Sequence, residues 1–387
     1  MMKKRILLPL FVSAVFFSLL FPDCDVPDFS HMGESNKIVL IWNKGYEKQT
    51  SQDVVHGMIW TFSWLGAELP EGSFAEAVQT QDSIRFTVNF DSLGFTDRAQ
   101  YALQGICDSI RRTEEYTARG GIDIGEFVML TLGCSNHYYK IVGAPVTLSD
   151  FKQEYHLDST VHVYGLNSSG IAKGKRLVHF SRDTSLLHYG FMAMEGTGSL
   201  DSGTFVADHY ECFDVMPNGQ LRFMVYGANG YLMDGTPKEY GDAGKPTKCL
   251  WCHETSIQPL FIDNRAVVGM MSNEEFLTYR DSMQARLQRY RFALKSDMNY
   301  ENHQEHTLGE LLYITYMEPT VMHIAHEWNT TEDSVRAILK SEESYKFEEF
   351  DYIGTVYHRK DVNYHDTLDV IEVPSSAREV GSEVNFQ

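Results

Sequence analysis

Residues 248–254, KCLWCHE, bring two thiols and an imidazole next to one another in the sequence. Cys249 and Cys252 are separated by two residues, and His253 directly follows the second cysteine. Four arrangements use such a set: covalent attachment of haem, a redox-active disulfide, a zinc site, or a structural pair without further chemistry. The compartment and the surrounding elements decide between them.

The haem interpretation requires two thiols that add across the two vinyl groups, and a histidine placed so that its imidazole lies under the iron. The sequence C-x-x-C-H meets each requirement. With 6 cysteines and 15 histidines in 387 residues, chance produces it in about three or four of a thousand such chains. The motif predicts one covalent haem c, attached at Cys249 and Cys252, with His253 as an axial ligand of the iron.

The other interpretations fit less well. A thioredoxin-like pair opens a long helix after a strand of a βαβ unit and has its tryptophan before the first cysteine, whereas Trp251 lies inside this pair. A zinc site needs a second Cys or His pair nearby, and His303 and His306 follow only some fifty residues later. A structural disulfide, or two buried thiols, remains as an alternative without haem.

The N-terminus predicts export. Lys3, Lys4 and Arg5 precede an uncharged, largely apolar run at 6–21, which is short for a membrane span and typical of a signal peptide at 1–23. Cys24 lies where a bacterial lipoprotein carries its lipid, although the preceding Phe-Pro-Asp departs from the usual small residues. Lipid anchoring, cleavage elsewhere and an uncleaved anchor stay open, and we expect a periplasmic protein or an outer-membrane lipoprotein.

Composition and charge narrow the class further. Apolar residues make up 43% of the chain, enough for a core, and the net charge of −20 argues against a nucleic-acid partner. Six cysteines are too few for a disulfide scaffold. Apart from Cys24 and the motif pair, Cys107, Cys134 and Cys212 remain, an odd number that predicts at least one buried thiol. A Cys107–Cys134 disulfide is one alternative.

Periodicity predicts an α+β fold with the motif at the end of an antiparallel meander. Asn218-Gly219 stands between two alternating runs, the pattern of a tight hairpin, and the motif then lies on a loop leaving the sheet, with its histidine near the start of a short helical turn. The acidic tail has eleven Asp or Glu against four Lys or Arg and is expected to attach loosely. The predicted regions are a linker at 24–49, a mainly helical region at 50–150, a β-rich haem-carrying region at 151–262, a helical region at 263–341 and the tail at 342–387.

The motif resembles that of c-type cytochromes. The order NGQLRFMVYGANGYL, a Gly/Pro-rich loop and then CLWCH is similar in layout, over residues 160–260, to the cytochrome P-460 and cytochrome c′-β type of domain. This resemblance implies a β-sheet that carries one haem beside a C-terminal C-x-x-C-H. Cytochrome P-460 proteins also cross-link a lysine to the porphyrin, and we place no such lysine in this chain.

Three functions follow from these patterns. The first is electron transfer in the cell envelope with a redox partner protein, which requires a second axial ligand at the iron. The second is a haem enzyme or a binder of small ligands, which requires an open position at the iron. A haem-free envelope protein with a structural C-x-x-C is the third. Histidines one helical turn apart and several methionines are candidates for the second ligand: Met192, Met194, Met270, Met271, Met317, Met322, His323 and His326.

Overall fold

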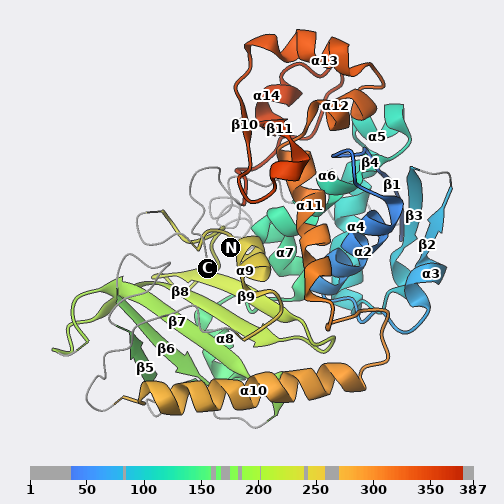
Figure 1. Ribbon diagram of the computed structural model, residues 1–387. Helices are drawn as coiled ribbons and strands as arrows, with labels where there is room; N and C mark the ends of the chain where they lie inside the picture. The colour runs from blue at the N-terminus through green and yellow to red at the C-terminus, as the bar shows by residue number, and fades with distance from the viewer. Residues whose placement is uncertain are drawn as a thin grey trace, which may run out of the picture.

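The computed structural model describes residues 36–81, 84–157, 163–166, 175–181, 185–200, 202–238, 243–257 and 270–377. A small sheet with helices forms the N-terminal part, a larger sheet occupies the middle, and helices follow toward the C-terminus (Figure 1). The predicted α+β class is confirmed. The predictions for the signal peptide and for Cys24 lie outside the described residues.

The N-terminal part contains a four-stranded sheet that the sequence patterns did not predict. Its strand order is β2-β3-β1-β4, with β1 antiparallel to β3 and parallel to β4. The strands are β1 (Lys37–Ile41), β2 (Val78–Thr80), β3 (Arg85–Asn89) and β4 (Ile122–Asp123). The helices are α2 (Ser51–Trp64), α3 (Ser73–Ala77), α4 (Asp97–Arg111), α5 (Glu114–Arg119), α6 (Ile124–Val128), α7 (Ser135–Val142) and α8 (Leu148–Glu154). Strand β1 therefore lies within the predicted linker.

Two long apolar helices, α2 and α11 (His306–Met317), cross at close range in the core. A methyl group on Gly57 would meet the carbonyl oxygen of Leu308 at 2.8 Å, and one on Gly309 would meet the Trp64 ring at 2.7 Å. Helix α2 begins with a capping box formed by Thr50 and Asp53, which satisfies two backbone amides at its start. The close crossing explains why glycines stand inside two helices, where they are otherwise unfavourable.

The central sheet is an antiparallel meander. Its strands are β5 (Val163–Leu166), β6 (Lys175–Phe180), β7 (Gly190–Thr197), β8 (Val206–Val215) and β9 (Leu221–Gly227), hydrogen-bonded in that order. The β8–β9 hairpin turns at Asn218-Gly219 as predicted, with Gly219 at φ +84°, a conformation that glycine adopts without strain. The Asn218 amide also donates to the carbonyl oxygens of Ser63 and Ala67, which fixes the hairpin to the end of α2.

The two faces of this sheet have different neighbours. Because directly paired residues of antiparallel strands share a face, three rows define what we call the motif face: Arg176–Glu195–His209, Val178–Ala193–Glu211–Val225 and Phe180–Phe191–Phe213–Phe223. On the opposite face, Tyr226 packs against Phe151 of α8 with ring centroids 6.3 Å apart. Helix α8 thus covers the face that the motif does not use.

The edge strand β9 is closed by two tyrosines of α7. The Tyr138 hydroxyl accepts a hydrogen bond from the amide of Phe223 at 3.2 Å, and the Tyr139 hydroxyl accepts one from the amide of Val225 at 3.1 Å. These bonds replace a further strand, so this edge does not present unpaired amides to another chain.

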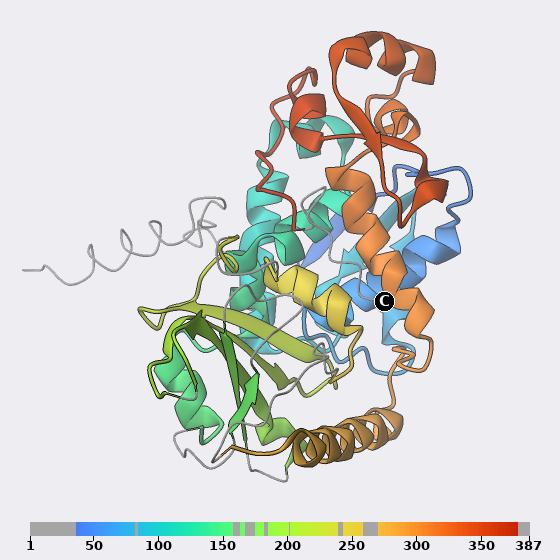
Figure 2. The ribbon, with the colours of Figure 1, turned by 60° about the vertical axis from the view of Figure 1, so that its left-hand side comes forward.

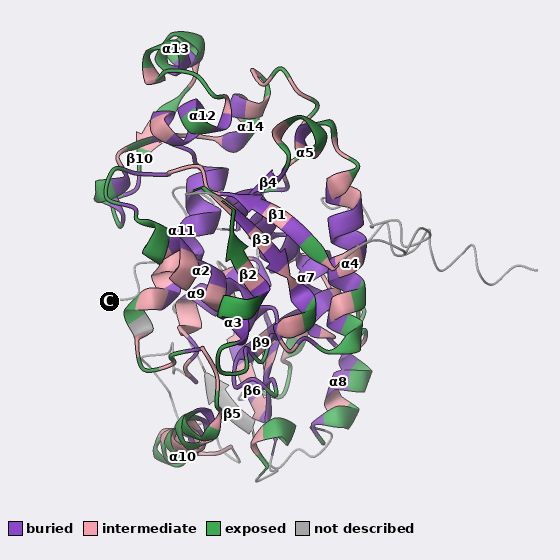
Figure 3. Ribbon diagram, turned by 90° about the vertical axis from the view of Figure 1, so that its right-hand side faces the viewer, coloured by how far each residue is buried: buried purple, intermediate pink, exposed green. Residues whose placement is uncertain are grey.

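The C-terminal part is helical and then continues into the acidic tail. The helices are α10 (Asn273–Ala293), α11, α12 (Val321–Glu327), α13 (Glu332–Ile338) and α14 (Arg359–Asn363), and a two-stranded sheet joins β10 (Ser344–Lys346) to β11 (Thr355–Tyr357). Short 3-10 turns occur at Phe90–Ser92, Leu186–His188, His303–Glu305, Leu339–Ser341 and Asp351–Ile353, and a π-helical turn at Met129–Gly133. Burial differs between these helices: most residues of α13 are exposed, whereas most residues of α11 are buried (Figure 3).

The tail was predicted to attach loosely, but its described part packs against the rest of the fold. In its described part, to residue 377, the side chains of Phe347, Val356 and Val362 are buried. Arg359 is only 1% exposed. Charge composition predicted a solvated segment because it does not show which apolar residues between the acids find a partner in the fold.

Candidate haem-attachment site

The motif lies in a helix, α9 (Pro246–His253), rather than on the loop that the sequence pattern predicted. Pro246 supplies the fixed φ of a first helical turn, and His253 is the last residue of the helix instead of standing before one. Figure 2 shows α9 between the central sheet and α11. The prediction was wrong here because the Gly/Pro-rich approach to the motif ends at residue 245, one residue before the helix begins.

The helical geometry groups the three reactive side chains. Positions three and four residues apart share one face of a helix, so Cys249, Cys252 and His253 project together. All three are partly exposed, whereas Leu250 and Trp251 are buried, the Trp251 ring 5.1 Å from that of Tyr313 in α11. The helix is therefore held by its apolar face and presents the motif on the other.

Neither motif cysteine is disulfide-bonded. Burial raises the pKa of the Cys249 thiol well above its ordinary value, and Glu211 raises it further. Cys252 stands at the penultimate position of α9, where the negative end of the helix dipole disfavours a thiolate. A thioredoxin-like pair needs the opposite, a thiol activated at a helix N-terminus, so this geometry argues against the redox-disulfide interpretation.

The imidazole of His253 rests on the sheet. Its ring centroid lies 4.9 Å from that of Phe223 and 5.7 Å from that of Phe213, and Nδ1 is 3.2 Å from the carbonyl oxygen of Ser256. That contact favours the tautomer with hydrogen on Nδ1, which leaves Nε2 as the basic nitrogen. Burial lowers the pKa of His253 to about 4, so the ring is neutral at neutral pH.

An aromatic row continues from this imidazole across the motif face. Ring centroids are 5.5 Å apart for Phe213 and Phe223, 4.6 Å for Phe191 and Phe213, and 5.8 Å for Phe180 and Phe191. At the far end, Phe276 and Tyr279 of α10 cover Phe180. The row gives His253 an apolar floor on the side of the sheet.

At its other end the motif face carries a buried group of charges, which we call the sheet cluster: Arg176, Glu195, His209 and Glu211. Arg176 is hydrogen-bonded to Glu195 and donates to Glu211 at 2.8 Å. Burial alone would raise the pKa of Glu211, but Arg176, His209 and a hydrogen bond from Thr236 outweigh it and lower the pKa to about 2. Sequence reasoning missed this cluster because its members stand on three strands, without a linear motif.

The structure separates most of the proposed second ligands from the motif. Met192 and Met194 pair with Cys212 and Tyr210, which places them on the face opposite to His253. Met317 is buried in α11, and Met322, His323 and His326 belong to α12, at the far end of the molecule from α9 (Figure 1). Met271 packs against the main core, and Met270 lies beside it at the start of the segment that leads into α10.

One further histidine, His306, lies beside the end of the motif helix. Its Nε2 lies 4.0 Å from a carboxylate oxygen of Glu254, the residue that follows His253, and its ring packs on Trp60. His306 begins α11 and is buried. The side chain of His303 lies outside the described residues.

The structure also shows the bonding state of the three cysteines Cys107, Cys134 and Cys212. Cys107 and Cys212 are buried and not disulfide-bonded, which confirms the expectation of a buried thiol, whereas Cys134 is disulfide-bonded. The suggested Cys107–Cys134 bridge is therefore wrong. Burial raises the pKa of both buried thiols, so neither is a reactive nucleophile.

A second group of buried charges lies where α5, α6, α12 and α14 meet. We call it the junction cluster: Glu115, Arg119, Asp123, Glu126, His323, Glu327 and Arg359. His323, weighed above as a ligand, belongs to it, with Nε2 3.5 Å from Asp123 Oδ2. Within the described part of the chain, no group of three or more His, Cys, Asp or Glu side chains is arranged to hold a metal ion. The ion pairs of Arg119 with Glu115 and of Arg359 with Glu327 make the cluster an ion-pair network.

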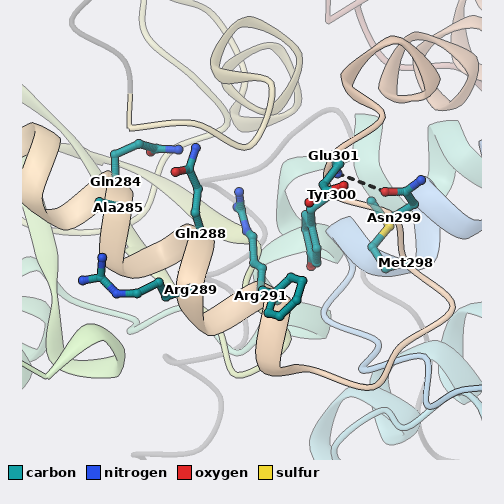
Figure 4. Close-up of a pocket in the computed structure, with 10 residues that line it drawn as sticks. Gln284, Ala285, Gln288, Arg289, Arg291, Met298, Asn299, Tyr300 and Glu301 are labelled. Atoms are coloured by element: carbon teal, nitrogen blue, oxygen red, sulfur yellow. Dashed lines mark hydrogen bonds between the residues drawn. The ribbon is translucent and has the colours of Figure 1, made fainter.

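A pocket of about 960 Å³ opens between α10 and the segment before α11. Arg289, Arg291 and Phe292 line one side of it, and Met298 and Tyr300 line the other (Figure 4). Arg291 also reaches the turn after His253, so the pocket wall is connected to the motif.

Comparison with family models, with curated proteins and with solved structures gave no match. In the part of the chain that the structure describes, no helix has the length and apolar character needed to cross a membrane.

Proposed function

We propose that this protein is an exported, mono-haem c-type cytochrome. The observation that carries the proposal is the placement of Cys249, Cys252 and His253 on one face of α9, with the imidazole resting on the aromatic row. Export is supported by the signal-like N-terminus, and the lipid anchor at Cys24 remains a prediction from sequence.

The residues present fit one haem. Cys249 and Cys252 would hold it through thioether bonds, His253 would ligate the iron through Nε2, and the Phe213 and Phe223 rings would exclude water from that side. A bound haem supplies reversible one-electron chemistry. The chain's own part is to keep the imidazole neutral and oriented, through burial and through the carbonyl oxygen of Ser256.

The test is covalent attachment. Produced in a periplasm with cytochrome c maturation machinery, the protein should retain its haem in a denaturing gel and gain about one haem mass per chain. The double variant Cys249→Ala/Cys252→Ala should lose the attached haem, whereas Cys212→Ala, at a buried thiol on the opposite face, should keep it. Loss of all haem from the wild-type chain on acid–acetone extraction would show that none is attached covalently and would refute the proposed c-type attachment.

Electron transfer is the use we propose for this haem, with a redox protein as partner. A haem protein with an open coordination position is the second candidate, and one observation favours it. The strand methionines that sequence reasoning offered as sixth ligands, Met192 and Met194, project from the wrong face of the sheet. Carbon monoxide added to the reduced protein separates the two, because rapid and tight binding indicates an open position and absence of binding indicates a carrier with a saturated iron.

A further inference from the structure

The chain makes an unusual turn directly after His253. Glu254 and Thr255 have φ values of +46° and +64°, so two consecutive residues other than glycine adopt the left-handed conformation. This conformation is strained for a residue with a side chain and persists only where the surroundings hold it. The turn matters for the motif because its next residue, Ser256, provides the carbonyl oxygen that contacts Nδ1 of His253.

Arg291 of α10 holds this turn. Its Nη2 donates to the carbonyl oxygen of Thr255 at 2.7 Å, its Nη1 reaches the Thr255 hydroxyl at 3.3 Å, and its Nε donates to the carbonyl oxygen of Gly219 at 2.8 Å. The guanidinium also lies 4.4 Å from the centre of the Tyr300 ring. One side chain therefore connects the turn to the β8–β9 hairpin, whose Phe223 forms part of the floor under His253.

A second side chain of α10 acts on the same segment. Gln284 lies two turns before Arg291 on the same face of the helix, and its amide oxygen accepts a hydrogen bond from the backbone amide of Ile257 at 2.8 Å. The residues bonded by α10 thus flank Ser256 on both sides.

The partners of Arg291 are unusual for a buried guanidinium. Only 7% of its surface is exposed, and the partners described above are two carbonyl oxygens, a hydroxyl and an aromatic ring, all neutral. Burial lowers the pKa of Arg291 to about 10. A buried cation is expensive unless its donors are satisfied, and the three directed hydrogen bonds of Arg291 to backbone and hydroxyl oxygens indicate a role in holding geometry.

We propose that Arg291, assisted by Gln284, is a positioning residue for His253: by fixing residues 255–257 it sets the carbonyl oxygen that orients the imidazole. This deepens the proposed function and rests on it for the link to haem. The orientation of the imidazole by this turn does not require haem, so it can be measured in the chain without the cofactor.

The experiment compares Arg291→Ala with Arg289→Ala. Arg289 is exposed, stands on the same helix and lines the same pocket (Figure 4), which makes it the matched control. In the full chain without haem, ¹⁵N NMR of the His253 ring should show mainly the Nδ1–H tautomer in the wild type and in Arg289→Ala. In Arg291→Ala the two tautomers should both be populated, and an unchanged ratio would overturn the proposal.

The haem-loaded protein gives a second readout. Arg291→Ala should keep covalent haem at close to the wild-type amount, because both cysteines remain, but the absorption spectrum of the reduced protein should shift, because the imidazole is misplaced in a large share of molecules. Should Arg291→Ala fail to fold, Gln284→Ala, which removes one partly exposed hydrogen bond, should shift both readouts in the same direction by less. No shift in Gln284→Ala would then count against the proposal. A wild-type chain without haem would refute the proposed function, whereas unchanged readouts in a haem-bearing variant would refute only the positioning role.

Discussion

The sheet cluster and the junction cluster are both buried groups of ionisable side chains, but they differ in how far arginines and hydrogen-bond donors compensate the carboxyl groups. In the sheet cluster one arginine lies between two glutamates and further hydrogen bonds complete the set, so the pKa of Glu211 falls to about 2 despite burial. In the junction cluster four carboxyl groups share two arginines, and burial raises the pKa of Glu115 to about 7 and that of Glu126 well above its ordinary value.

The difference shows that burial alone does not decide the charge of a group. Among the described residues, neither carboxyl oxygen of Glu126 and neither ring nitrogen of His323 has a hydrogen-bond partner. Glu211, in contrast, accepts hydrogen bonds from Arg176 and Thr236 and also contacts His209. A buried carboxyl without donors is more stable as the neutral acid. We therefore expect the charge of the junction cluster to change with pH between 4 and 8, while Glu211 beside the motif stays ionised.

The largest expected effect is the loss of Arg359. This residue is 1% exposed, donates twice to Glu327 and lies 4.0 Å from the centre of the Tyr316 ring. Arg359→Ala leaves a buried carboxylate with less compensation and should lower the free energy of unfolding by about 3–5 kcal/mol in denaturant titrations. Arg336→Ala, which breaks an exposed pair with Glu332, is the control and should change it by less than about 0.5 kcal/mol.

His323 should make the protein less stable in mild acid. Its pKa falls from 6.5 to about 4 on folding, mainly through burial, with Asp123 opposing and Arg359 adding to the shift. A depressed folded pKa contributes stability that is present above pH 6.5 and lost as the pH falls toward 4, by about 3 kcal/mol. Glu115 acts in the opposite sense, so the measurement is the difference in unfolding free energy between wild type and His323→Gln from pH 7 to 4. A constant difference would contradict the prediction.

Glu126 should show the reverse dependence. Its raised folded pKa means that its contribution to stability is greatest in acid and is lost as the pH rises. Glu126→Gln keeps the shape of the side chain but cannot ionise. At pH 8 its free energy of unfolding should be higher than that of the wild type by on the order of 1–3 kcal/mol, the range for a buried polar group without a partner. Near pH 5 the two proteins should unfold at similar denaturant concentrations; a variant weaker than wild type at both pH values would indicate an ionised Glu126.

The smallest expected effect concerns the sheet cluster. Thr236→Val removes one hydrogen bond to Glu211, at 3.0 Å, and should lower the free energy of unfolding by about 1–2 kcal/mol. The acid midpoint of unfolding should also rise, because the pKa of Glu211 would be less depressed. Thr117→Val, at an exposed hydroxyl bonded only within its own helix, should leave both values close to wild type.

Local sequence determined several features of this protein. The spacing of Cys249, Cys252 and His253 requires that they share a face once a helix forms, and Asn218-Gly219 specifies the hairpin, because each depends on neighbouring residues alone.

Tertiary structure decided how these pieces are used. The floor under His253 and the sheet cluster arise from strand register, and Arg291 reaches Thr255 from 36 residues away. Arg119 and Glu327 meet across 208 residues. Pattern reasoning does not predict such pairings because it detects periodic burial within one element, whereas the partner of a single arginine or histidine depends on how separate elements pack. For the same reason the sequence offered both Met192 and His323 as candidate ligands. The fold places Met192 on the face of the sheet opposite to the motif, and His323 in the junction cluster.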